Sequence, residues 1–355
     1  MRFVRRLHDG GKLALHVFSG AAIKTDGYKY SEEEAGFPVT CCGVPKRRFG
    51  VSPSAALSVA KLIRSKRPAV VMMPIEKKLL GMIGWIWLLR LLYRFDLVSY
   101  NHACLRSTGR VATNFDMWLS GFLFRRYDRI IFYTQDAREF ALSHQLVNPS
   151  RSYFANNTLD TTEIFSLAND AASTEPTKRI LFIGRLIANK RVDLFLKYHA
   201  ALAELDSNIE CHIIGDGPES KLVAAVCSDS ATIHYHGAIV DENAIASHIN
   251  LCHAVFVPGA SGLAIVHAFA YGKPYITIRG DQFTHGPEFS YLQDGVNGLV
   301  LDKLDFQSNV KRIYELLSNQ TKWAECCRQA KQTALNLSVD QWCDQMTKGL
   351  LEAQY

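Results

Sequence analysis

Two cations stand five residues apart directly after an apolar segment that is typical of a buried strand. The segment Ile180–Ile183 runs into Gly184 and Arg185, and Lys190 follows before the next helical pattern begins. Glycine permits a tight turn at a strand end, so both cations are expected beyond the carboxyl edge of a sheet, close to a helix N-terminus. Positive charge at such a place suits a diphosphate. On spacing alone, ordinary surface charge is an equally good interpretation.

Two more strand-like segments of the second half of the chain end in glycine-containing turns. Ile213–Pro218 reads IIGDGP and includes Gly215, and Thr232–Tyr235 is followed by His236 and Gly237. Glycines at these positions allow the backbone to approach a ligand closely. Each turn is common in proteins, so neither predicts a site without the others.

A loop of small residues, Gly259–Gly262, opens the apolar helical stretch Leu263–Tyr271. The first turn of a helix offers backbone N–H groups to a phosphate. His267 lies on this helix between apolar neighbours, where a histidine is more often a hydrogen-bonded core group than a ligand. The polar loop that follows contains His285 and Glu288.

These turns belong to an alternation of strand-like and helix-like segments over the whole chain, which predicts two α/β domains of the doubly wound type. Residues 21–50 are polar and are expected to form a loop. A composition change at residues 166–178 indicates a linker, so we expect one domain at 1–168 and another at 169–337, with a helix at about 338–355 that packs back on the first. Expected strands are Lys12–Phe18, Ala69–Met73, Asp96–Tyr100, Arg129–Tyr133, Arg179–Ile183, Glu210–Ile214, Thr232–Tyr235, Ala254–Val257 and Tyr275–Ile278.

Composition excludes several classes of protein. The chain has 355 residues, of which 48% are hydrophobic and 21% charged, so it can bury two cores and is not intrinsically disordered. Its nine cysteines show no CxxC spacing, which argues against a disulfide framework and a zinc site built from thiolates. The longest apolar run, Leu79–Leu89, is too short to span a bilayer, and the first residues do not resemble a secretory leader.

Charge is distributed unevenly along the chain. Residues 1–165 contain 24 Lys or Arg against 13 Asp or Glu, whereas residues 166–355 contain 16 against 21. A basic half suggests an anionic partner: a membrane surface, a phosphorylated substrate or nucleic acid. No RNA-binding, zinc-finger or basic-zipper pattern accompanies the basic residues, so nucleic acid is the weakest of these interpretations. The apolar helix expected at Leu79–Phe95 is either a core helix or a membrane-facing one.

A resemblance to the family 4 glycosyltransferases of the GT-B fold runs through the chain from about Asp96 to Leu301. FANNTLDT (Phe154–Thr161) is similar to the segment that precedes the donor domain in that family. Five further segments resemble the donor domain of that family: ILFIGRLIANKR, IIGDGP, HYHG, SGLAIVHAFAYGKPYIT and YLQDGVNG. The resemblance implies two Rossmann-like domains that face a cleft, and a retaining transfer of a sugar from a nucleotide-sugar to an acceptor hydroxyl, without a metal or other cofactor.

Residue roles follow from the same resemblance. Arg185 and Lys190 match the pair that grips the donor diphosphate, and His102 stands where relatives place a polar residue near the transferred sugar. These three are the expected catalytic residues. The expected donor-binding residues are Gly184, Gly215, Gly237, Ser261, Gly262, Leu263 and His267.

Two departures from the family pattern affect these expectations. The family has two glutamates eight positions apart, and this chain has Gly259 and His267 there. His267 can still hydrogen-bond a ribose, whereas Gly259 has no carboxylate, so we expect His285 and Glu288 to supply sugar contacts. The family's first strand and glycine-rich loop should precede Lys12–Phe18, so we expect an N-terminal unit that begins late or is trimmed.

The sequence therefore predicts a hexosyltransferase of surface-polysaccharide biosynthesis, such as that of lipopolysaccharide or capsule. Its expected partners are a nucleotide-sugar and a glycan acceptor linked to a lipid, and its expected location is the cytoplasm, at the inner face of the membrane. Two alternatives remain: a GT-B enzyme that epimerises or hydrolyses a nucleotide-sugar, and a non-catalytic subunit that binds one.

Overall fold

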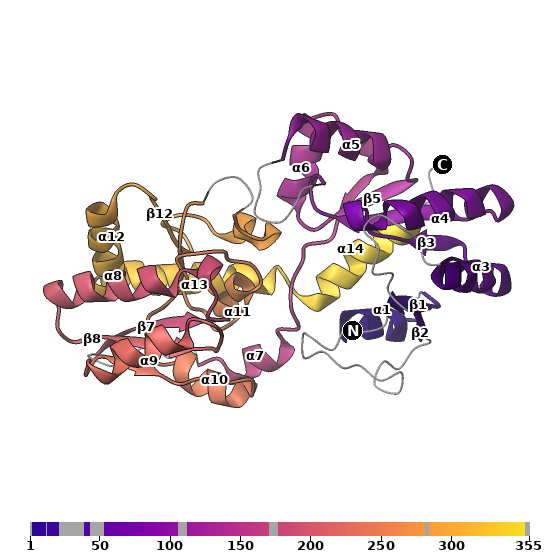
Figure 1. Ribbon diagram of the computed structural model, residues 1–355. Coiled ribbons are helices and arrows are strands. Elements are labelled where there is room, and N and C mark those ends of the chain that lie inside the picture. The colour runs from indigo at the N-terminus through magenta and orange to yellow at the C-terminus, as the bar shows by residue number, and fades with distance from the viewer. Residues whose placement is uncertain are drawn as a thin grey trace. The chain divides into compact units, whose positions relative to one another are not determined.

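The computed structural model describes residues 2–11, 13–20, 39–42, 53–105, 112–169, 177–280 and 284–351. These residues form two compact α/β units (Figure 1). The first consists of the described residues before Asn157 together with those from Asp340 onward, and the second spans Asn157–Val339. Within the described ranges, no helix is long and apolar enough to cross a membrane.

The second unit begins about a dozen residues before the boundary that we expect at residue 168. Helix α7 (Thr162–Leu167) contacts α10 (Glu242–Ile249) and α11 (Ala264–Ala270), which both belong to the second unit. Ile164 is buried in the hydrophobic core of that unit. The expected linker lies largely outside the described residues.

The first unit contains a parallel sheet of four strands in the order β3-β4-β5-β6. A second, two-stranded parallel sheet is formed by β1 (Val17–Gly20) and β2 (Val39–Cys42). The strand expected over Lys12–Phe18 therefore begins only at Val17, and the region expected to be a loop contributes a strand. The four larger-sheet strands are β3 (Val70–Met72), β4 (Asp96–Asn101), β5 (Arg129–Phe132) and β6 (Ser152–Phe154).

Helix α5 of the first unit begins at Asn114, because Thr113 and Asp116 form a capping box that satisfies backbone N–H groups of the first turn. The helices are α1 (Arg2–Asp9), α3 (Pro53–Lys66), α4 (Leu80–Leu92), α5 (Asn114–Phe124), α6 (Gln135–Ser143) and α14 (Val339–Leu351).

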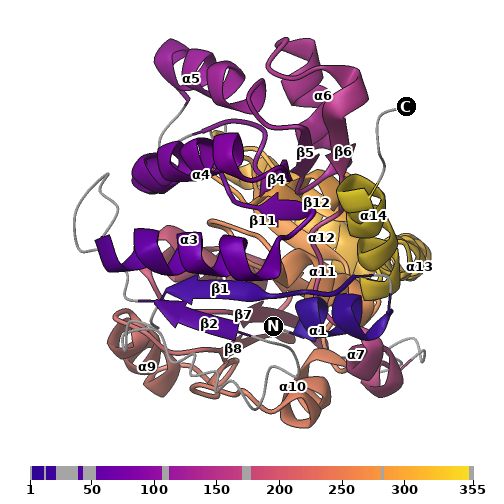
Figure 2. The same cartoon turned by 90° about the vertical axis from the view of Figure 1, so that its right-hand side faces the viewer.

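The C-terminal helix α14 packs on the sheet of the first unit (Figure 2). Trp342, Met346 and Leu350 are buried there with Val98 of β4 and Ile131 of β5. The guanidinium of Arg129 donates a hydrogen bond of 2.9 Å to the carbonyl oxygen of Leu350. The first unit is thus built from two segments of the chain that are distant in sequence.

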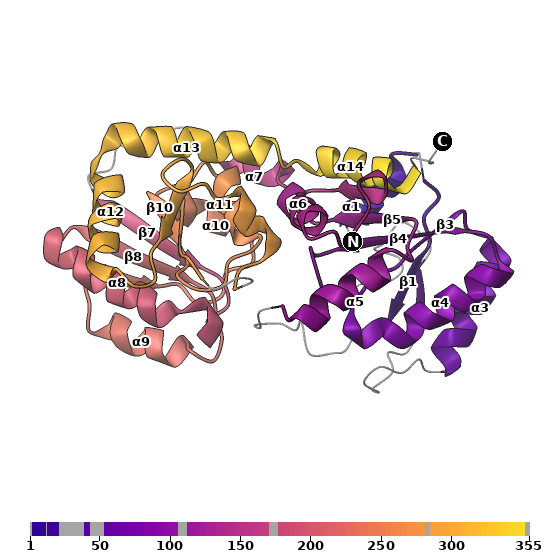
Figure 3. The ribbon, with the colours of Figure 1, turned by 90° about the horizontal axis from the view of Figure 1, so that it is seen from above.

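The second unit contains a six-stranded parallel sheet in the order β12-β11-β10-β7-β8-β9. Its strands are apolar on both faces at the centre, as in sheets that are covered by helices on both sides (Figure 3). The strands are β7 (Lys178–Ile183), β8 (Ile209–Ile214), β9 (Ile233–Tyr235), β10 (Ala254–Phe256), β11 (Tyr275–Ile278) and β12 (Gly298–Leu301). Besides α7, α10 and α11, its helices are α8 (Val192–Leu205), α9 (Ser220–Ser228), α12 (Phe306–Ser318) and α13 (Gln320–Leu335).

The strand order reverses between β7 and β10, which lie side by side. From β7 the chain proceeds to β8 and β9 on one side, and from β10 to β11 and β12 on the other. In open parallel sheets, ligands bind outside the carboxyl ends of the strands at such a switch point. We therefore expect the predicted site at the turns that follow β7 and β10.

Candidate active site

The turn after β7 is closely packed against the turn after β8. Gly184 has a φ of +147° and Gly215 a φ of +149°, a region of backbone space that favours glycine. A Cβ at Gly215 would lie 1.8 Å from the carbonyl oxygen of Gly184. The amide of Gly215 in turn donates to the carbonyl oxygen of Gly237, at 2.8 Å. Three of the predicted donor-binding glycines thus join neighbouring strand exits at one sheet edge.

The segment after β7 is also bonded to the loop after β10. The backbone N–H groups of Gly259 and Ala260 donate to the carbonyl oxygens of Lys190, at 3.1 Å, and Asn189, at 2.8 Å. The ammonium of Lys190 donates to the carbonyl oxygen of Ala260. Lys190 ends a short 3₁₀ helix, Ala188–Lys190, so its side chain is held against the loop that precedes α11.

Gly259 has no space for a side chain. A Cβ at this position would lie 2.1 Å from the carbonyl oxygen of Asn189 and 2.6 Å from the carbonyl carbon of Lys190. Those atoms belong to backbone, which cannot rotate away as a flexible side chain can. The glutamate that the family pattern places here is incompatible with this packing.

Lys190 lies in an electrostatic cluster with Arg185 and Glu288. Burial lowers the pKa of Lys190 and the positive charge of Arg185 lowers it further, while the carboxylate of Glu288 acts in the opposite direction. Burial raises the pKa of Glu288, against the effects of Asn157 and Lys190. Arg185 is exposed, whereas Glu288 is buried. The structure therefore brings together both predicted cations and one predicted sugar contact.

Asn157 is a residue of this cluster that the sequence analysis does not single out. Its side-chain amide donates a hydrogen bond to a carboxylate oxygen of Glu288. It lies in the FANNTLDT segment, directly after the exit from β6. A polar residue at a strand end was therefore the sequence feature that could have indicated Asn157. The contact spans 131 residues of sequence and is not visible in a local pattern.

His285 has both ring nitrogens bonded within the protein. Its Nδ1 accepts from the backbone N–H of Ser261, at 3.2 Å, and its Nε2 donates to the carbonyl oxygen of Ile278, at 3.0 Å. Burial lowers the pKa of this imidazole, which agrees with a neutral ring. A sugar contact from His285 would require one of these bonds to break, so in this structure His285 positions the loop at Ser261.

Ser261 is buried, and its hydroxyl takes part in a network with Tyr275 and Thr277. Next to it, Gly262 lies close to Glu288, because a Cβ at Gly262 would be 3.3 Å from Oε2 of that carboxylate. Leu263 is 40% exposed at the start of α11. Gly262 and Leu263 are therefore more accessible to a ligand than the buried side chain of Ser261.

His267 is paired with a carboxylate that the sequence analysis does not single out. Its Nε2 lies 2.8 Å from Oε1 of Glu242 in α10, and the hydroxyl of Tyr271 donates to the same oxygen at 2.8 Å. His267 thus has the hydrogen-bonded environment of a core histidine, and Glu242 places a carboxylate beside it. Glu242 follows Asp241, the N-cap of α10, so its sequence context indicates a helix start and not a site.

His102, the third predicted catalytic residue, lies in the first unit. It is exposed at the end of β4, and its ring packs edge-on against Tyr133, with centroids 4.6 Å apart. The cluster around Lys190 belongs to the second unit.

Comparison with solved structures shows which proteins share this fold. The structure is similar to a glycosyltransferase of Rickettsia africae, with a TM-score of 0.68, 12% identity and coverage of 96% of this chain and 99% of that one. It is also similar to HepE of Anabaena, crystallised with UDP and glucose, with a TM-score of 0.61, 16% identity and coverage of 89% and 86%. The fold is that of the GT-B glycosyltransferases, as the sequence predicts.

Residues 177–319, in the second unit, match the family described as glycosyl transferases group 1. Over 175 residues the chain is 30% identical to a GDP-mannose-dependent alpha-mannosyltransferase of Corynebacterium glutamicum. That match covers 48% of this chain, and the chain spans 38% of the length of that relative. The similarity to group 1 glycosyltransferases is thus established for residues 177–319 of the second unit.

Proposed function

We propose that this protein is a retaining family 4 glycosyltransferase that moves a hexose from a nucleotide-sugar to a hydroxyl of a glycan acceptor. The observation that carries the proposal is the cationic pair Arg185 and Lys190 at the switch point between β7 and β10, with Lys190 bonded to the loop after β10. A nucleoside diphosphate is the ligand whose negative charge suits this cationic pair at a switch point.

The chemistry of the transfer explains why fixed cations are needed. When the bond between the sugar and the phosphate breaks, negative charge develops on the departing diphosphate. Positive charge that is already in place stabilises this state without reorganisation. Arg185 offers a planar fork of donors, and the half-buried ammonium of Lys190 is held by the carbonyl oxygen of Ala260. Because side chains supply this charge, we propose that the reaction requires no metal ion.

The buried carboxylate of Glu288 is the sugar contact that we propose. It lies beside Gly262 and is held by Asn157. A carboxylate accepts hydrogen bonds from sugar hydroxyls, and its electrostatic interaction with Lys190 supports a role close to the proposed diphosphate site. We assign His285 a positioning role, since its two nitrogens are bonded to Ser261 and Ile278.

An apolar surface of the first unit supports work at a membrane. On α5, Phe115, Trp118 and Phe122 form a stacked ladder, and the guanidinium of Arg126 lies over both Phe122 and Trp87 of α4. One turn beyond Trp87, Leu91 is 83% exposed. We call the exposed large apolar residues of these helices the α4–α5 surface: Leu88, Leu91, Leu92, Phe115 and Trp118.

Only one face of α4 is buried, by Ile83, Ile86 and Leu89. The core interpretation of this helix describes that face, and the exposed leucines lie outside it. Exposed aromatic and leucine side chains beside arginines are the groups that bind an anionic interface. We propose the cytoplasmic membrane face as the partner of the α4–α5 surface, and a lipid-linked glycan of a surface polysaccharide as the acceptor.

Two measurements on the full chain test the proposed function. Thermal denaturation with UDP, GDP, ADP, CMP or dTDP identifies the donor base, because a bound nucleotide raises the apparent stability by mass action. The nucleotide-sugars of that base are then incubated with and without glycan acceptors. Sugar transferred to an acceptor supports the proposal.

Other outcomes would contradict the proposed function. Free sugar that forms at the same rate without an acceptor would indicate the hydrolase alternative. Nucleotide binding without turnover on any acceptor would indicate the non-catalytic subunit. If none of the five nucleotides raised the melting temperature, the proposed donor site would be wrong.

A further inference from the structure

Four histidines and a glutamate gather on one face of the second sheet, at β8, β9 and α10. Side chains two apart on a strand point to the same face, so Glu210 and His212 of β8 share a face, as do His234 and His236 at β9. His212 is the register partner of His234, and this pairing aligns the two strands' histidines. The last turn of α10 adds His248. None of these groups belongs to the cluster around Lys190.

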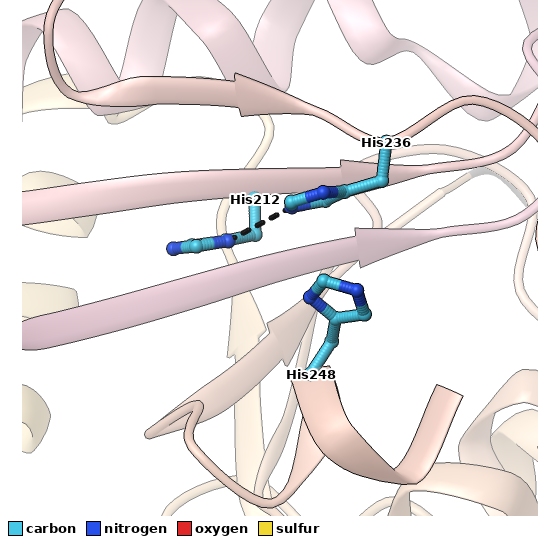
Figure 4. A group of neighbouring side chains, drawn as sticks. All are labelled: His212, His236 and His248. Carbon is cyan, nitrogen blue, oxygen red and sulfur yellow. Dashed lines mark hydrogen bonds between the residues drawn. The ribbon is translucent and has the colours of Figure 1, made fainter. Parts of the chain in front are cut away.

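Three of these imidazoles have the spacing of metal ligands (Figure 4). Nδ1 of His212 lies 3.0 Å from Nε2 of His236, and the rings of His236 and His248 have centroids 4.1 Å apart. One nitrogen of each of the three lies within 4.8 Å of the others. A tetrahedral Zn²⁺ with bonds of about 2.0–2.1 Å holds its ligand nitrogens roughly 3.3 Å apart.

The second ring nitrogen of His212 has the partner that a metal-bound histidine usually has. Nε2 lies 3.3 Å from Oε2 of Glu210, and the same carboxylate oxygen accepts from Nε of Arg179 at 2.8 Å. Histidine ligands generally donate their free N–H to a carboxylate, which fixes the tautomer and aims the other nitrogen at the metal. With its proton on Nε2, His212 presents the lone pair of Nδ1 toward His236.

The chemistry of these side chains suits such a metal. Imidazole nitrogens are typical ligands of Zn²⁺ and of other late divalent transition metals.

We propose that His212, His236 and His248 form a binding site for a divalent transition metal, with Zn²⁺ as the expected occupant and Glu210 as the residue that orients His212. The fourth coordination position is left to water. This site is separate from the proposed sugar transfer, which uses side-chain cations. A metal here would tie β8, β9 and α10 together. It would also brace the turn at Gly237, whose carbonyl oxygen accepts from the amide of Gly215.

The test is a Zn²⁺ titration of the untagged full chain after removal of metal with a chelator, with an indicator of known affinity in competition. One equivalent of Zn²⁺ is expected to bind at micromolar or lower concentration, and to raise the melting temperature of the second unit. Co²⁺ at the same site is expected to give the visible absorption of a tetrahedral nitrogen environment. These readouts do not depend on transfer activity, so they remain interpretable if the proposed function fails.

Variants identify the ligands. His236→Gln and His248→Gln should each weaken binding by at least the roughly 10–100-fold that loss of an outer partner costs, and Glu210→Gln should fall within that range. His144→Gln, which changes the exposed histidine that follows α6 as its C-cap, is the matched control and should bind normally. Circular dichroism shows which variants fold, and His248→Gln changes only a half-buried helix position.

Two results would overturn the proposal. The first is the absence of Zn²⁺ binding at micromolar concentration by folded wild-type protein. The second is undiminished binding by the folded double variant His236→Gln/His248→Gln, which would place the metal on other groups such as the free thiols of Cys327 and Cys343.

Discussion

The ammonium group of Lys190 donates a hydrogen bond to the carbonyl oxygen of Ala260, so a side chain from the β7 exit is tied to the loop that leaves β10. The backbone reinforces this contact, since the amides of Gly259 and Ala260 donate to carbonyl oxygens of the Lys190 segment. The charge of Lys190 is thereby held beside that of Arg185 before any ligand arrives. Two like charges in proximity are unfavourable in the free protein, and an anionic ligand relieves that repulsion.

Arg185→Ala should reduce turnover by about 10²-fold or more. We derive this from the typical cost of about 2.7–4 kcal/mol for the loss of one fixed donor to a developing negative charge. Steady-state transfer assays at saturating donor measure the effect. Arg328→Ala, which removes an exposed arginine paired with Glu325 on α13, is the control and should leave turnover unchanged. Near-normal turnover of the Arg185 variant would contradict its assignment.

Gly259→Ala should destabilise the second unit. The new Cβ would lie 2.1 Å from the carbonyl oxygen of Asn189, and overpacking of this kind costs about 1–3 kcal/mol. For a domain of this size that corresponds to a fall in melting temperature of roughly 2–4 °C per kcal/mol. Gly84→Ala in α4 is the control, because a Cβ there has no atom within 4 Å. Equal melting temperatures for both variants would show that the Asn189–Gly259 contact is absent in solution.

Glu288→Gln should change the dependence of stability on pH. Burial raises the pKa of Glu288 above its value in the unfolded chain. Between these two values the folded state binds more protons than the unfolded state, so the free energy of unfolding falls as pH rises through this interval. The glutamine cannot ionise, so its stability relative to wild type should increase with pH and level off above the raised pKa.

Urea denaturation at a series of pH values measures this difference in the free energy of unfolding. Glu204→Gln, at an exposed position of α8, serves as the control and should follow wild type at every pH. If the curves of the Glu288 variant and wild type were parallel from pH 4 to neutrality, Glu288 would not have the buried environment described above.

The double variant Leu91→Asp/Leu92→Asp should lose binding to anionic vesicles. Leu91 and Leu92 are among the most exposed apolar residues of α4, and aspartate there adds both polarity and repulsion. Flotation with vesicles that contain phosphatidylserine, at low and high salt, measures the binding. Leu304→Asp, at a 92% exposed position of the second unit, is the matched control. If wild-type protein failed to float with the vesicles at low salt, the proposal that the α4–α5 surface binds a membrane would be wrong.

Much of the secondary structure was predictable because it depends on local pattern. The strand expected at Arg179–Ile183 is β7 (Lys178–Ile183), and the helical stretch expected at Leu263–Tyr271 contains α11 (Ala264–Ala270). The start of α5 was also present in the sequence, as Thr113 and Asp116 at capping-box spacing. β2 was not predicted, because Val39–Cys42 is a short strand inside a polar region.

The candidate site was predictable in part. Gly184, Arg185 and Lys190 follow a strand, so their place at a sheet edge follows from local pattern. The roles expected for His267 and His285 depended on which partners would reach them, and those partners, Glu242 and Ser261, come from other elements. In the sequence, Gly259 is noticeable only because it lacks the carboxylate of the family pattern. The structure shows that this position is in close contact with the backbone of Asn189.

The sequence by itself determined which residues stand at strand exits, because hydrophobic periodicity and glycine act over a few neighbouring residues. Only the tertiary structure decided that the exits of β7 and β10 adjoin, and that β8 and β9 align Glu210, His212, His234 and His236 on one face. Strand order and register arise from packing between segments that are far apart in the chain. For that reason the contact of Lys190 with Ala260 and the histidine cluster became visible only in three dimensions.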